Sequence, residues 1–412
     1  MNLKLLILTQ YFPPEVGAPQ NRLFELAVRL QKSGVDVTVL TAMPNYPEMK
    51  IHEAYRGKRY VYEELQGLKI HRSRIYVPTS KSFVKRLVNY FSFVHTSAMC
   101  GTFKIKGDFD YLMCESPPLF LGLSALWLRK RKKAKMIFNV SDLWPETAEK
   151  LGLVNNKLLL GISYKLEAYL YKKSVLITGQ TQGICENISS RFPQKKTYWL
   201  PNGVDVSYYD VNKIKSSWRT ENGFSTDDFL LLYAGIIGYA QGLDVILEAA
   251  EKTKAYPRIK YILLGSGPEK ERLLELKEKK QLANVIFCNG VGKDKMPFIV
   301  SAIDAAIIPL KRLDIFKGAI PSKIFENLAM KKPVILGVEG EAKALFVDEG
   351  KCALAYEPEN ATDLAEKTLY LYSNSRLVKE MGENGLAYVT EKFNRDTIAK
   401  NFYKVLKNLN IA

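Results

Sequence analysis

Short apolar segments alternate with longer segments of helical spacing along the whole chain. Most of the short segments are nearly continuous hydrophobic runs, the pattern of strands that are buried on both faces of a parallel sheet. This alternation predicts the α/β fold class. Strands are expected at Leu3–Thr9, Val35–Thr41, Lys69–Ser73, Tyr111–Cys114, Lys135–Val140 and Val175–Gly179, and then at Phe229–Gly235, Lys260–Gly265, Val285–Asn289, Ala305–Pro309, Pro333–Val338 and Ala353–Tyr356.

The series of strands restarts after Leu200–Asp205, a stretch with Pro and Asn-Gly breakers that reads as a linker. We therefore expect two doubly wound, Rossmann-like domains at residues 1–200 and 201–390. Residues 391–412 hold a last helix, Asp396–Leu409, which we expect to pack back on the first domain. Ligands of such sheets bind beyond the carboxyl ends of the strands, so we expect the site in a cleft between the two domains.

Composition places the chain among ordinary globular proteins, with 47% hydrophobic residues in 412. No apolar run reaches the roughly 18 residues of a spanning helix. The apolar run in Met1–Gln10 is too short for a signal peptide and reads as a buried first strand. The five cysteines form no CxxC pair, which favours buried, reduced thiols in a cytosolic protein.

Charge narrows the range of partners. The formal net charge is +17, from 60 Lys and Arg against 43 Asp and Glu. Nucleic acid, an anionic membrane surface and phosphorylated substrates are the partners that such an excess fits. The chain has no zinc-finger, RNP-type or helix-turn-helix signature, so the last two partners are favoured and nucleic acid is not expected.

A candidate anion site follows the strand Ala305–Pro309, in the segment Pro321–Glu326. Ser322 is a good N-cap, and the free N–H groups at a helix start suit a diphosphate. Lys323, with Lys311 and Arg312 from the preceding loop, adds positive charge. Glu326 lies one turn further along, where a carboxylate can accept hydrogen bonds from the vicinal diol of a ribose.

This segment resembles the donor signature of retaining glycosyltransferases of family 4, which have the two-domain GT-B fold. Many members carry two glutamates with seven residues between them; the second matches Glu326 and binds the ribose hydroxyls, and the first falls at Gly318 here. The sequence is closer to a subgroup with Pro-Ser-Lys-x-x-Glu, common among bacterial surface-polysaccharide enzymes of O-antigen and capsule assembly. The resemblance implies that Ser322, Lys323, Ile324 and Glu326 bind the donor. The alternative is an ordinary amphipathic helix with a surface glutamate.

Three further loops of the second half resemble the same family. Tyr233–Asp244 resembles its first C-terminal loop, in which Gly235 and Gly238 let the backbone approach the donor. Many relatives have a basic residue in that loop; here there is none, which shifts the role to Lys311, Arg312 or Lys323. Leu264–Pro268 resembles the family's Gly-x-Gly-Pro turn. Asn289–Val291 stands where relatives hold the nucleobase by backbone contacts, which implies the same role for Gly290 and Val291.

The first half is expected to supply the acceptor side. Its first loop, Tyr11–Arg22, lacks the GxGxxG of nicotinamide-binding domains. It resembles the family's first glycine loop, in which the backbone near Gly17 meets the donor diphosphate and the acceptor. We expect Arg22 to be structural.

Two carboxylates of the first half follow strands, Glu115 and Asp142. Asp142 resembles the Asp-Leu-Trp-Pro motif of the polysaccharide subgroup and could orient the acceptor hydroxyl or act as base; the alternative is a turn or helix cap beside Trp144. Glu115 is the weaker catalytic candidate.

The sequence supports neither a catalytic histidine nor a metal site. We expect the three histidines to be structural or exposed; they are His52, His71 and His95. Asp108-Phe109-Asp110 has the Asp-x-Asp spacing of metal-dependent transferases, but it reads as a turn after Gly107. Neither a metal nor a cofactor is expected.

One helix, expected over Lys81–Phe103, has a wide apolar stripe through Phe83, Leu87, Tyr90 and Val94, joined by Val84, Val88 and Phe91. Lys85, Asn89, Ser92 and Thr96 line its other face, and basic residues surround it. Such a helix either lies on an anionic membrane or packs in the core with a solvated basic face.

Together these patterns predict a retaining glycosyltransferase that moves a sugar, an N-acetylated hexosamine or 6-deoxyhexosamine, from a UDP-sugar to a saccharide. The acceptor is expected on a polyprenyl diphosphate or another carrier at the inner face of the cell membrane, where a cytoplasmic enzyme would be peripheral. The alternatives are a UDP-N-acetylhexosamine 2-epimerase and an inactive nucleotide-sugar-binding protein.

Overall fold

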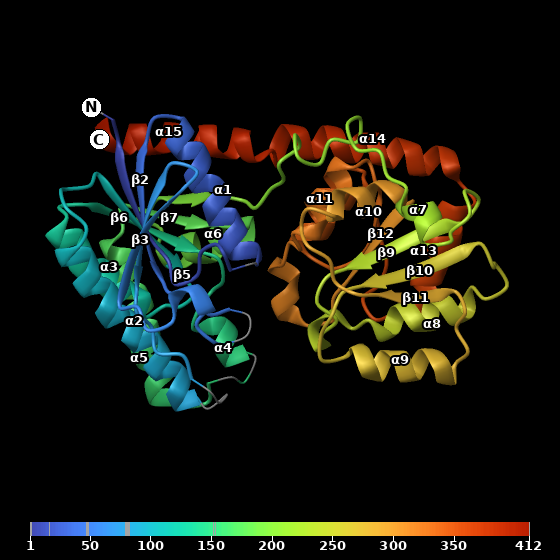
Figure 1. Cartoon of the computed structure of the whole chain (residues 1–412), viewed down its shortest axis with the longest axis horizontal. Helices are drawn as coiled ribbons and strands as arrows, with labels where there is room; N and C mark the ends of the chain where they lie inside the picture. Colours follow the sequence, from blue (N-terminus) through green and yellow to red (C-terminus); the bar gives the residue numbers. More distant parts are fainter. Residues whose placement is uncertain are drawn as a thin grey trace. The chain divides into compact units, whose positions relative to one another are not determined.

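The computed structural model describes residues 2–15, 17–46, 49–78, 83–150, 152 and 154–411. The chain divides into two compact units (Figure 1). The N-terminal unit is Met1–Asn202 together with Arg395–Ala412, and the C-terminal unit is Gly203–Asn394. The second unit is therefore an insertion in the first, with boundaries close to those expected from the linker. The two ends of the insertion meet, because Val204 N donates to Phe393 O at 2.9 Å and Val204 bridges Asn394.

The N-terminal unit is built on an eight-stranded sheet of order β3-β4-β2-β1-β5-β6-β7-β8. All neighbouring pairs are parallel except the β3–β4 pair at one edge. The strands are β1 (Lys4–Leu8), β2 (Asp36–Ala42), β3 (Tyr60–Leu65), β4 (Leu68–Ser73), β5 (Tyr111–Ser116), β6 (Lys135–Val140), β7 (Leu176–Gly179) and β8 (Thr197–Trp199).

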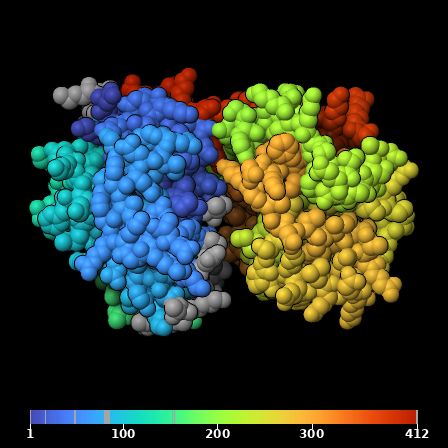
Figure 2. Space-filling model, viewed as in Figure 1, coloured from blue at the N-terminus to red at the C-terminus, as the bar shows by residue number. Residues whose placement is uncertain are grey.

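Helices cover both faces of this sheet. Alternate residues of β1 point to opposite faces, and each face has its own apolar core. One core packs under α2 (Phe83–Phe103), α3 (Leu121–Arg131), α5 (Lys157–Lys173) and α6 (Gln182–Arg191). The other packs under α1 (Ala18–Lys32) and α15 (Arg395–Ile411). The C-terminal helix thus belongs to the N-terminal unit, and its red surface shows beside the blue segments (Figure 2). Short helices are η1 (Glu53–Tyr55) and α4 (Glu146–Lys150).

The C-terminal unit has a fully parallel six-stranded sheet of order β11-β10-β9-β12-β13-β14. Its strands are β9 (Phe229–Ala234), β10 (Ile259–Leu264), β11 (Val285–Cys288), β12 (Ala305–Pro309), β13 (Val334–Gly337) and β14 (Ala353–Ala355). Its helices are α7 (Trp218–Glu221), η2 (Tyr239–Gln241), α8 (Asp244–Lys252), α9 (Lys270–Lys279), α10 (Met296–Ala302), η3 (Asp314–Gly318), α11 (Lys323–Ala329), α12 (Glu341–Lys343), η4 (Ala344–Glu349), α13 (Ala361–Tyr372) and α14 (Ser375–Lys392).

Both sheets reverse their strand order at one point, as doubly wound folds do. In the N-terminal unit the reversal lies between β1 and β5, and in the C-terminal unit between β9 and β12. The loops that follow these four strands therefore line the place in each unit where a ligand is expected.

The twelve predicted strands all exist, with ends shifted by a residue or two. The strands β3 and β8 were not predicted from the sequence. β3 is an antiparallel edge strand with the sequence YVYEEL and no fully buried residue, so it lacks the apolar run that marked the others. β8 has three residues and lies at the other edge. An edge strand packs against one neighbour, and its apolar signal is correspondingly weak.

The prediction that Asn89 lies on the solvated face of the helix Lys81–Phe103 is wrong. α2 begins at Phe83, and Lys81 lies outside the described residues. Asn89, which was expected on the solvated face, is 4% exposed, while Val88 and Phe91 are exposed. Asn89 is buried because it bonds inside the protein: its Oδ1 accepts from Gln10 Nε2 at 3.1 Å, and its Nδ2 donates to Tyr76 O at 2.5 Å.

The cysteines are all free thiols, and four of the five are buried, as expected; the exception is the half-buried Cys288. Among the described residues, no helix has both the length and the apolar character needed to cross a membrane.

Candidate functional site

Glycine-rich loops lie in backbone contact at the carboxyl edge of the C-terminal sheet. A Cβ on Gly265 would stand 1.8 Å from the carbonyl oxygen of Gly235, and one on Gly267 would stand 2.2 Å from that of Ile237. The loops after β9 and β10 also share a hydrogen bond from Ile237 N to Ser266 O, at 2.9 Å. Only glycine allows this approach, and the result is an edge with exposed backbone and little side-chain bulk.

Lys323, the first residue of α11, extends back to the loop after β9. Its Nζ lies 4.4 Å from the centroid of the Tyr233 ring, and a Cβ on Gly235 would stand 2.7 Å from it. Burial lowers the pKa of the Lys323 ammonium to about 8, although the Glu326 carboxylate raises it. Within the described part of the chain no hydrogen-bond or ion-pair acceptor is found for this Nζ. The loop that contains Gly235 has no basic residue of its own, and α11 places the ammonium group of Lys323 beside it.

The start of α11 differs from the expected anion site. Ser322 forms no side-chain cap, because its backbone is already helical. The amide of Ile324 donates to the carbonyl of Pro321 at 3.1 Å and so is occupied within the protein. α11 has seven residues, about two turns, which limits the contribution of its dipole. The positive charge here comes chiefly from the Lys323 side chain.

Glu326 lies one turn further along α11 and is half-buried. Its charge acts on two neighbours, raising the pKa of Lys323 and that of Tyr208. Tyr208 was not anticipated from the sequence. Burial first, and then the charges of Asp294 and Glu326, raise its pKa, and its hydroxyl donates to Lys293 O at 3.2 Å. Tyr208 and Tyr209 stand in a segment without a recognisable motif, so the sequence did not mark Tyr208 as a site residue. Only the fold brings it to the loop after β11.

The two basic residues after β12 behave differently. Lys311 Nζ lies 3.3 Å from the centroid of the Tyr239 ring, and its amide donates to Ala240 O at 3.0 Å, so it is held against the loop after β9. Arg312 pairs with Glu357 at 2.7 Å. Of the two, Lys311 stays near the glycine loops, while the charge of Arg312 is neutralised at the surface.

The other donor-binding candidates lie on the same loops. Gly238 precedes the short helix η2 in extended conformation. A Cβ on Gly290 would stand 3.8 Å from the Cα of Gly265, so the loop after β11 adjoins the loop after β10. Val291 is exposed beyond it. The structure brings these residues to one edge of the sheet, while their contacts with a donor stay predictions.

In the N-terminal unit, Glu115 at the end of β5 forms a buried ion pair with Arg22 of α1, 2.9 Å apart. Asn139 and Ser141 also donate to its carboxylate, and Arg22 donates to Gln180 at 2.5 Å. Burial raises the pKa of Glu115, and the Arg22 charge opposes this shift. Both carboxylate oxygens are occupied and only 4% of the residue is exposed, so Glu115 is placed to fix α1 and not to meet an acceptor. Arg22 is structural, as expected.

The loop after β1 is held by a buried glutamate. Glu15 accepts from the amides of Phe12, Asn45 and Tyr46 at 3.0, 2.8 and 2.9 Å, which ties this loop to the one after β2. Gly17, in extended conformation, comes just before α1, and a Cβ there would stand 2.4 Å from Gln20 Oε1. Gly17 thus lies at the point where the strand order of the N-terminal sheet reverses.

Asp142 is half-buried in the turn after β6. Its Oδ1 accepts from Thr147 Oγ1 at 2.7 Å, and its carbonyl accepts from Trp144 N at 2.9 Å. Burial raises the pKa of its carboxyl group. This geometry fits the turn alternative.

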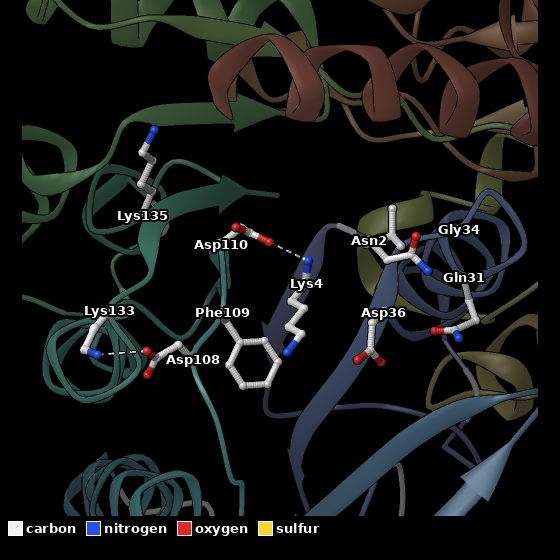
Figure 3. A pocket seen from close by; sticks show the side chains of 11 residues that line it. Asn2, Lys4, Gln31, Gly34, Asp36, Asp108, Phe109, Asp110, Lys133 and Lys135 are labelled. Atoms are coloured by element: carbon white, nitrogen blue, oxygen red, sulfur yellow. Dashed lines mark hydrogen bonds and ion pairs between the residues drawn. The ribbon is translucent and has the colours of Figure 1, made fainter. Parts of the chain in front are cut away.

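Asp108 and Asp110 lie far from these loops, at the amino edge of the N-terminal sheet. They line a depression of about 800 Å³ (Figure 3). Asp110 accepts from Lys4 N at 2.7 Å, and Asp108 pairs with Lys133 at 2.9 Å. No group of metal-ligating side chains is found in the described ranges. His71, one of the three histidines, bonds to Tyr60 at 2.9 Å, and burial lowers its pKa to about 4.

Comparison with known proteins agrees with this architecture. Residues 17–203 match the family described as a glycosyl transferase 4-like domain, and residues 214–387 match the one described as glycosyl transferases group 1. The chain therefore consists of two glycosyltransferase domains. Among its relatives is the putative colanic acid biosynthesis glycosyl transferase WcaI of Escherichia coli K12, 24% identical over 93% of this chain and 96% of that protein. Another is the O-antigen chain mannosyltransferase C of Escherichia coli, 20% identical over 94% and 93%.

The fold is GT-B, the fold of its structural neighbours. Anabaena HepE, solved in complex with UDP and glucose, aligns with a TM-score of 0.69 and 15% identity over 98% of this chain and 99% of that one. The predicted fold class is thereby confirmed. The two family matches confirm the expectation of a glycosyltransferase.

Proposed function

We propose that this glycosyltransferase moves a sugar from a UDP-sugar to a saccharide on a lipid carrier, with retention of anomeric configuration, in the assembly of a surface polysaccharide. The observation that carries the donor half is the position of Lys323, whose ammonium lies against Gly235 with Glu326 one turn further along α11. The names of the colanic acid and O-antigen relatives support the polysaccharide.

The geometry suits a nucleoside diphosphate. Lys323 is poised to bind the diphosphate, because its cation is partly desolvated and lacks an acceptor within the described residues. The glycine loops after β9 and β10 let the phosphates approach the backbone. Glu326 would then accept from the ribose hydroxyls, with Tyr208 and the loop at Gly290 and Val291 on the nucleobase side.

In this proposal Lys323 also assists the reaction. As the bond between the anomeric carbon and the diphosphate oxygen breaks, negative charge develops on the leaving phosphate, and a fixed cation stabilises it. The acceptor hydroxyl attacks from the same face of the sugar and passes its proton to that phosphate. Lys311 adds a second positive charge beside Tyr239. Asp142 is the one carboxylate of the two candidates with room to orient the acceptor, since Glu115 is enclosed.

The sugar and the nucleotide are the finer parts of the proposal. The Pro-Ser-Lys-x-x-Glu segment supports an N-acetylated hexosamine or a 6-deoxyhexosamine, and the HepE complex supports UDP. The mannosyltransferase relative points to a different sugar. The epimerase alternative is not favoured, because both halves of the chain match glycosyltransferases.

A two-stage experiment tests the proposal. Thermal shift with UDP, GDP and ADP identifies the nucleotide, and UDP is expected to stabilise the protein most. Mass spectrometry then follows UDP-sugars with and without a polyprenyl-diphosphate saccharide, and transfer with UDP release is expected only when the acceptor is present. Stronger binding of GDP would overturn the donor, and release of UDP with a free epimerised sugar would favour the epimerase. Binding without turnover in any combination would indicate the inactive binding protein.

A further inference from the structure

The helix α2 exposes apolar residues on its outer side and buries two polar residues, Asn89 and Ser97, beside the apolar Phe93 and Cys100 on its inner side. Val88, Phe91, Met99 and Phe103 form one exposed stripe at helical spacing, and Phe103 is 69% exposed. On the inner side, Asn89 and Ser97 are buried and bonded, the latter to Ser124 at 2.8 Å. A helix on a water-facing surface normally exposes polar residues and buries apolar ones.

Two neighbouring helices extend this apolar stripe. α3 contributes the exposed Leu123 and Trp127, and Trp127 Nε1 donates to Thr102 Oγ1 of α2 at 3.0 Å. α5 joins α3 through Arg129, which donates to Lys173 O at 2.7 Å. Its exposed apolar residues are Leu158, Ile162 and Tyr169. The three helices pack on one side of the same sheet (Figure 1), so these residues form one face, which we call the α2–α3–α5 face.

The charges on this face are almost all positive. The three helices hold nine basic residues, namely Lys85, Arg86, Arg129, Lys130, Arg131, Lys157, Lys165, Lys172 and Lys173. Their one acidic residue, Glu167, is 1% exposed and is paired with Arg191. Trp127 also has the Arg131 guanidinium 4.8 Å from its ring centroid. Exposed aromatics beside Lys and Arg are the combination that favours the interface of an anionic bilayer.

The whole charge excess of the protein lies in the unit that carries this face. The N-terminal unit has 34 Lys and Arg against 16 Asp and Glu, a formal charge of +18, while the C-terminal unit has 26 against 27, a charge of −1. Two such basic units repel one another, so a second copy of the chain is a poor occupant of the face. The positive charge favours a negatively charged surface as the binding partner of the α2–α3–α5 face.

We propose that the α2–α3–α5 face binds the surface of an anionic phospholipid bilayer, with Phe91, Met99, Phe103 and Trp127 in the interfacial layer and the lysines at the headgroups. This inference rests on the proposed function, since a lipid-linked acceptor is what brings the enzyme to a membrane. The surface that contacts the membrane consists of α3, α5 and the outer side of α2.

Vesicle flotation of the full chain tests the proposal. The protein is expected to float with vesicles of phosphatidylcholine mixed with phosphatidylglycerol, and to stay in solution with phosphatidylcholine alone. Raising the salt from about 0.1 M to about 1 M should reduce binding, because the headgroup attraction is screened. Equal binding to both kinds of vesicle would overturn the electrostatic part.

Matched variants locate the surface. The double variant Met99→Glu/Phe103→Glu and the triple variant Lys85→Glu/Lys165→Glu/Lys172→Glu should each lower vesicle affinity at least roughly tenfold. The charge control is Lys400→Glu/Lys404→Glu/Lys407→Glu on α15, which packs under the other face of the sheet. The apolar control is Tyr370→Glu in the C-terminal unit, also exposed. Loss of binding in the controls, or its survival in both test variants, would show that the face is not the contact.

Two further readouts separate the possible failures. The melting temperature and the thermal shift with UDP should be unchanged in all variants, because every substituted residue is exposed and lies outside the donor loops. Size-exclusion chromatography with light scattering should give a monomer; a dimer lost in Met99→Glu/Phe103→Glu would make the occupant a second copy and overturn the proposal. Vesicle binding is measured without donor, so a chain that binds vesicles but transfers no sugar would refute the proposed function alone.

Discussion

The two units place a basic residue at the same topological position and use it in opposite ways. Each sheet reverses its strand order at one point, and a cation lies at each reversal: Arg22 in the N-terminal unit and Lys323 in the C-terminal unit. Arg22 is enclosed by Glu115, Ser141 and Gln180. Lys323 instead faces an aromatic ring and a glycine backbone.

The partners of a charged group at the edge of a sheet therefore distinguish a structural charge from a ligand-binding one. A buried charge whose partners are all internal fixes the fold, because removing one partner leaves the other unpaired. A desolvated charge without an acceptor costs stability, and a bound anion compensates that cost. By this criterion the N-terminal pair positions α1 and the Gly17 loop, while Lys323 fits the donor-binding role that we propose for it.

The largest expected effect is on stability, in Arg22→Met. The substitution leaves the Glu115 carboxylate buried without its cation, which should cost about 3–5 kcal/mol and lower the melting temperature by roughly 10 °C. Differential scanning calorimetry measures it. Arg56→Met, at an exposed arginine of the same unit, is the control and should shift the melting temperature little. A shift in Arg22→Met no larger than in the control would mean that the pair is not structural.

Next is Lys323→Met, which should weaken UDP binding by about 10- to 100-fold, since charge-assisted hydrogen bonds contribute roughly 1.5–3 kcal/mol. In contrast to Arg22→Met, it should leave the melting temperature of the free protein unchanged or higher, because a desolvated charge is removed. Isothermal titration calorimetry with UDP measures the affinity. Lys279→Met, at the exposed end of α9, is the matched control. An unchanged affinity in Lys323→Met would remove the lysine from the site.

Glu326→Ala should lower UDP affinity about tenfold while the fold stays intact, because hydrogen bonds from a diol to a carboxylate are lost. Comparison of UDP with 2′-deoxy-UDP makes the test specific. The wild type should discriminate between the two ligands, and the variant should bind both alike. Glu380→Ala on α14 changes an equally charged, exposed residue and should behave as the wild type. Discrimination that survives in Glu326→Ala would place the ribose elsewhere.

The last prediction is a pH dependence of UDP affinity, which is negligible below pH 8 and should belong to Lys323 alone. Its pKa in the free protein is about 8, so the ammonium is charged below that pH and neutral above it. A bound diphosphate raises this pKa, and UDP affinity should therefore be flat up to pH 8 and fall by up to about tenfold for each further pH unit. Calorimetry from about pH 6.5 to 9.5 covers the transition. Lys323→Met should give a flat profile; a fall of the same size there would assign the titration to another group.

The sequence predicted the parallel core of both units because every strand that is buried on both faces carries an apolar run. It did not predict β3, whose charged residues suit an exposed antiparallel edge. Spacing placed Lys323 and Glu326 on one short helix, but it could not give the distance from Lys323 to Gly235, which depends on how the sheet brings α11 and the loop after β9 together. Tyr208 is brought to the site by the fold alone.

Polar contacts explain the predictions that were wrong. Ser322 looked like an N-cap by type, yet the backbone there is already helical and its side chain caps nothing. For α2 the sequence left open whether the apolar side packs in the core or faces a membrane, and it put Asn89 on the polar, solvated side. The orientation of this helix depends in part on Asn89 and Ser97, which have hydrogen-bond partners in the loop after β1, on α3 and in the loop after β4, and no count of apolar residues includes those hydrogen bonds.

The meeting of Val204 with Phe393 and Asn394 has an evolutionary consequence. An insertion whose two ends are joined side by side can be exchanged as a cassette, since the host needs only two adjacent attachment points. In the proposed function the C-terminal unit carries the residues that select the nucleotide, whereas the N-terminal unit carries the basic charge. If both proposals hold, recombination at residues 202–204 and 393–395 would give a chimera that uses a different sugar donor and binds the same membrane surface.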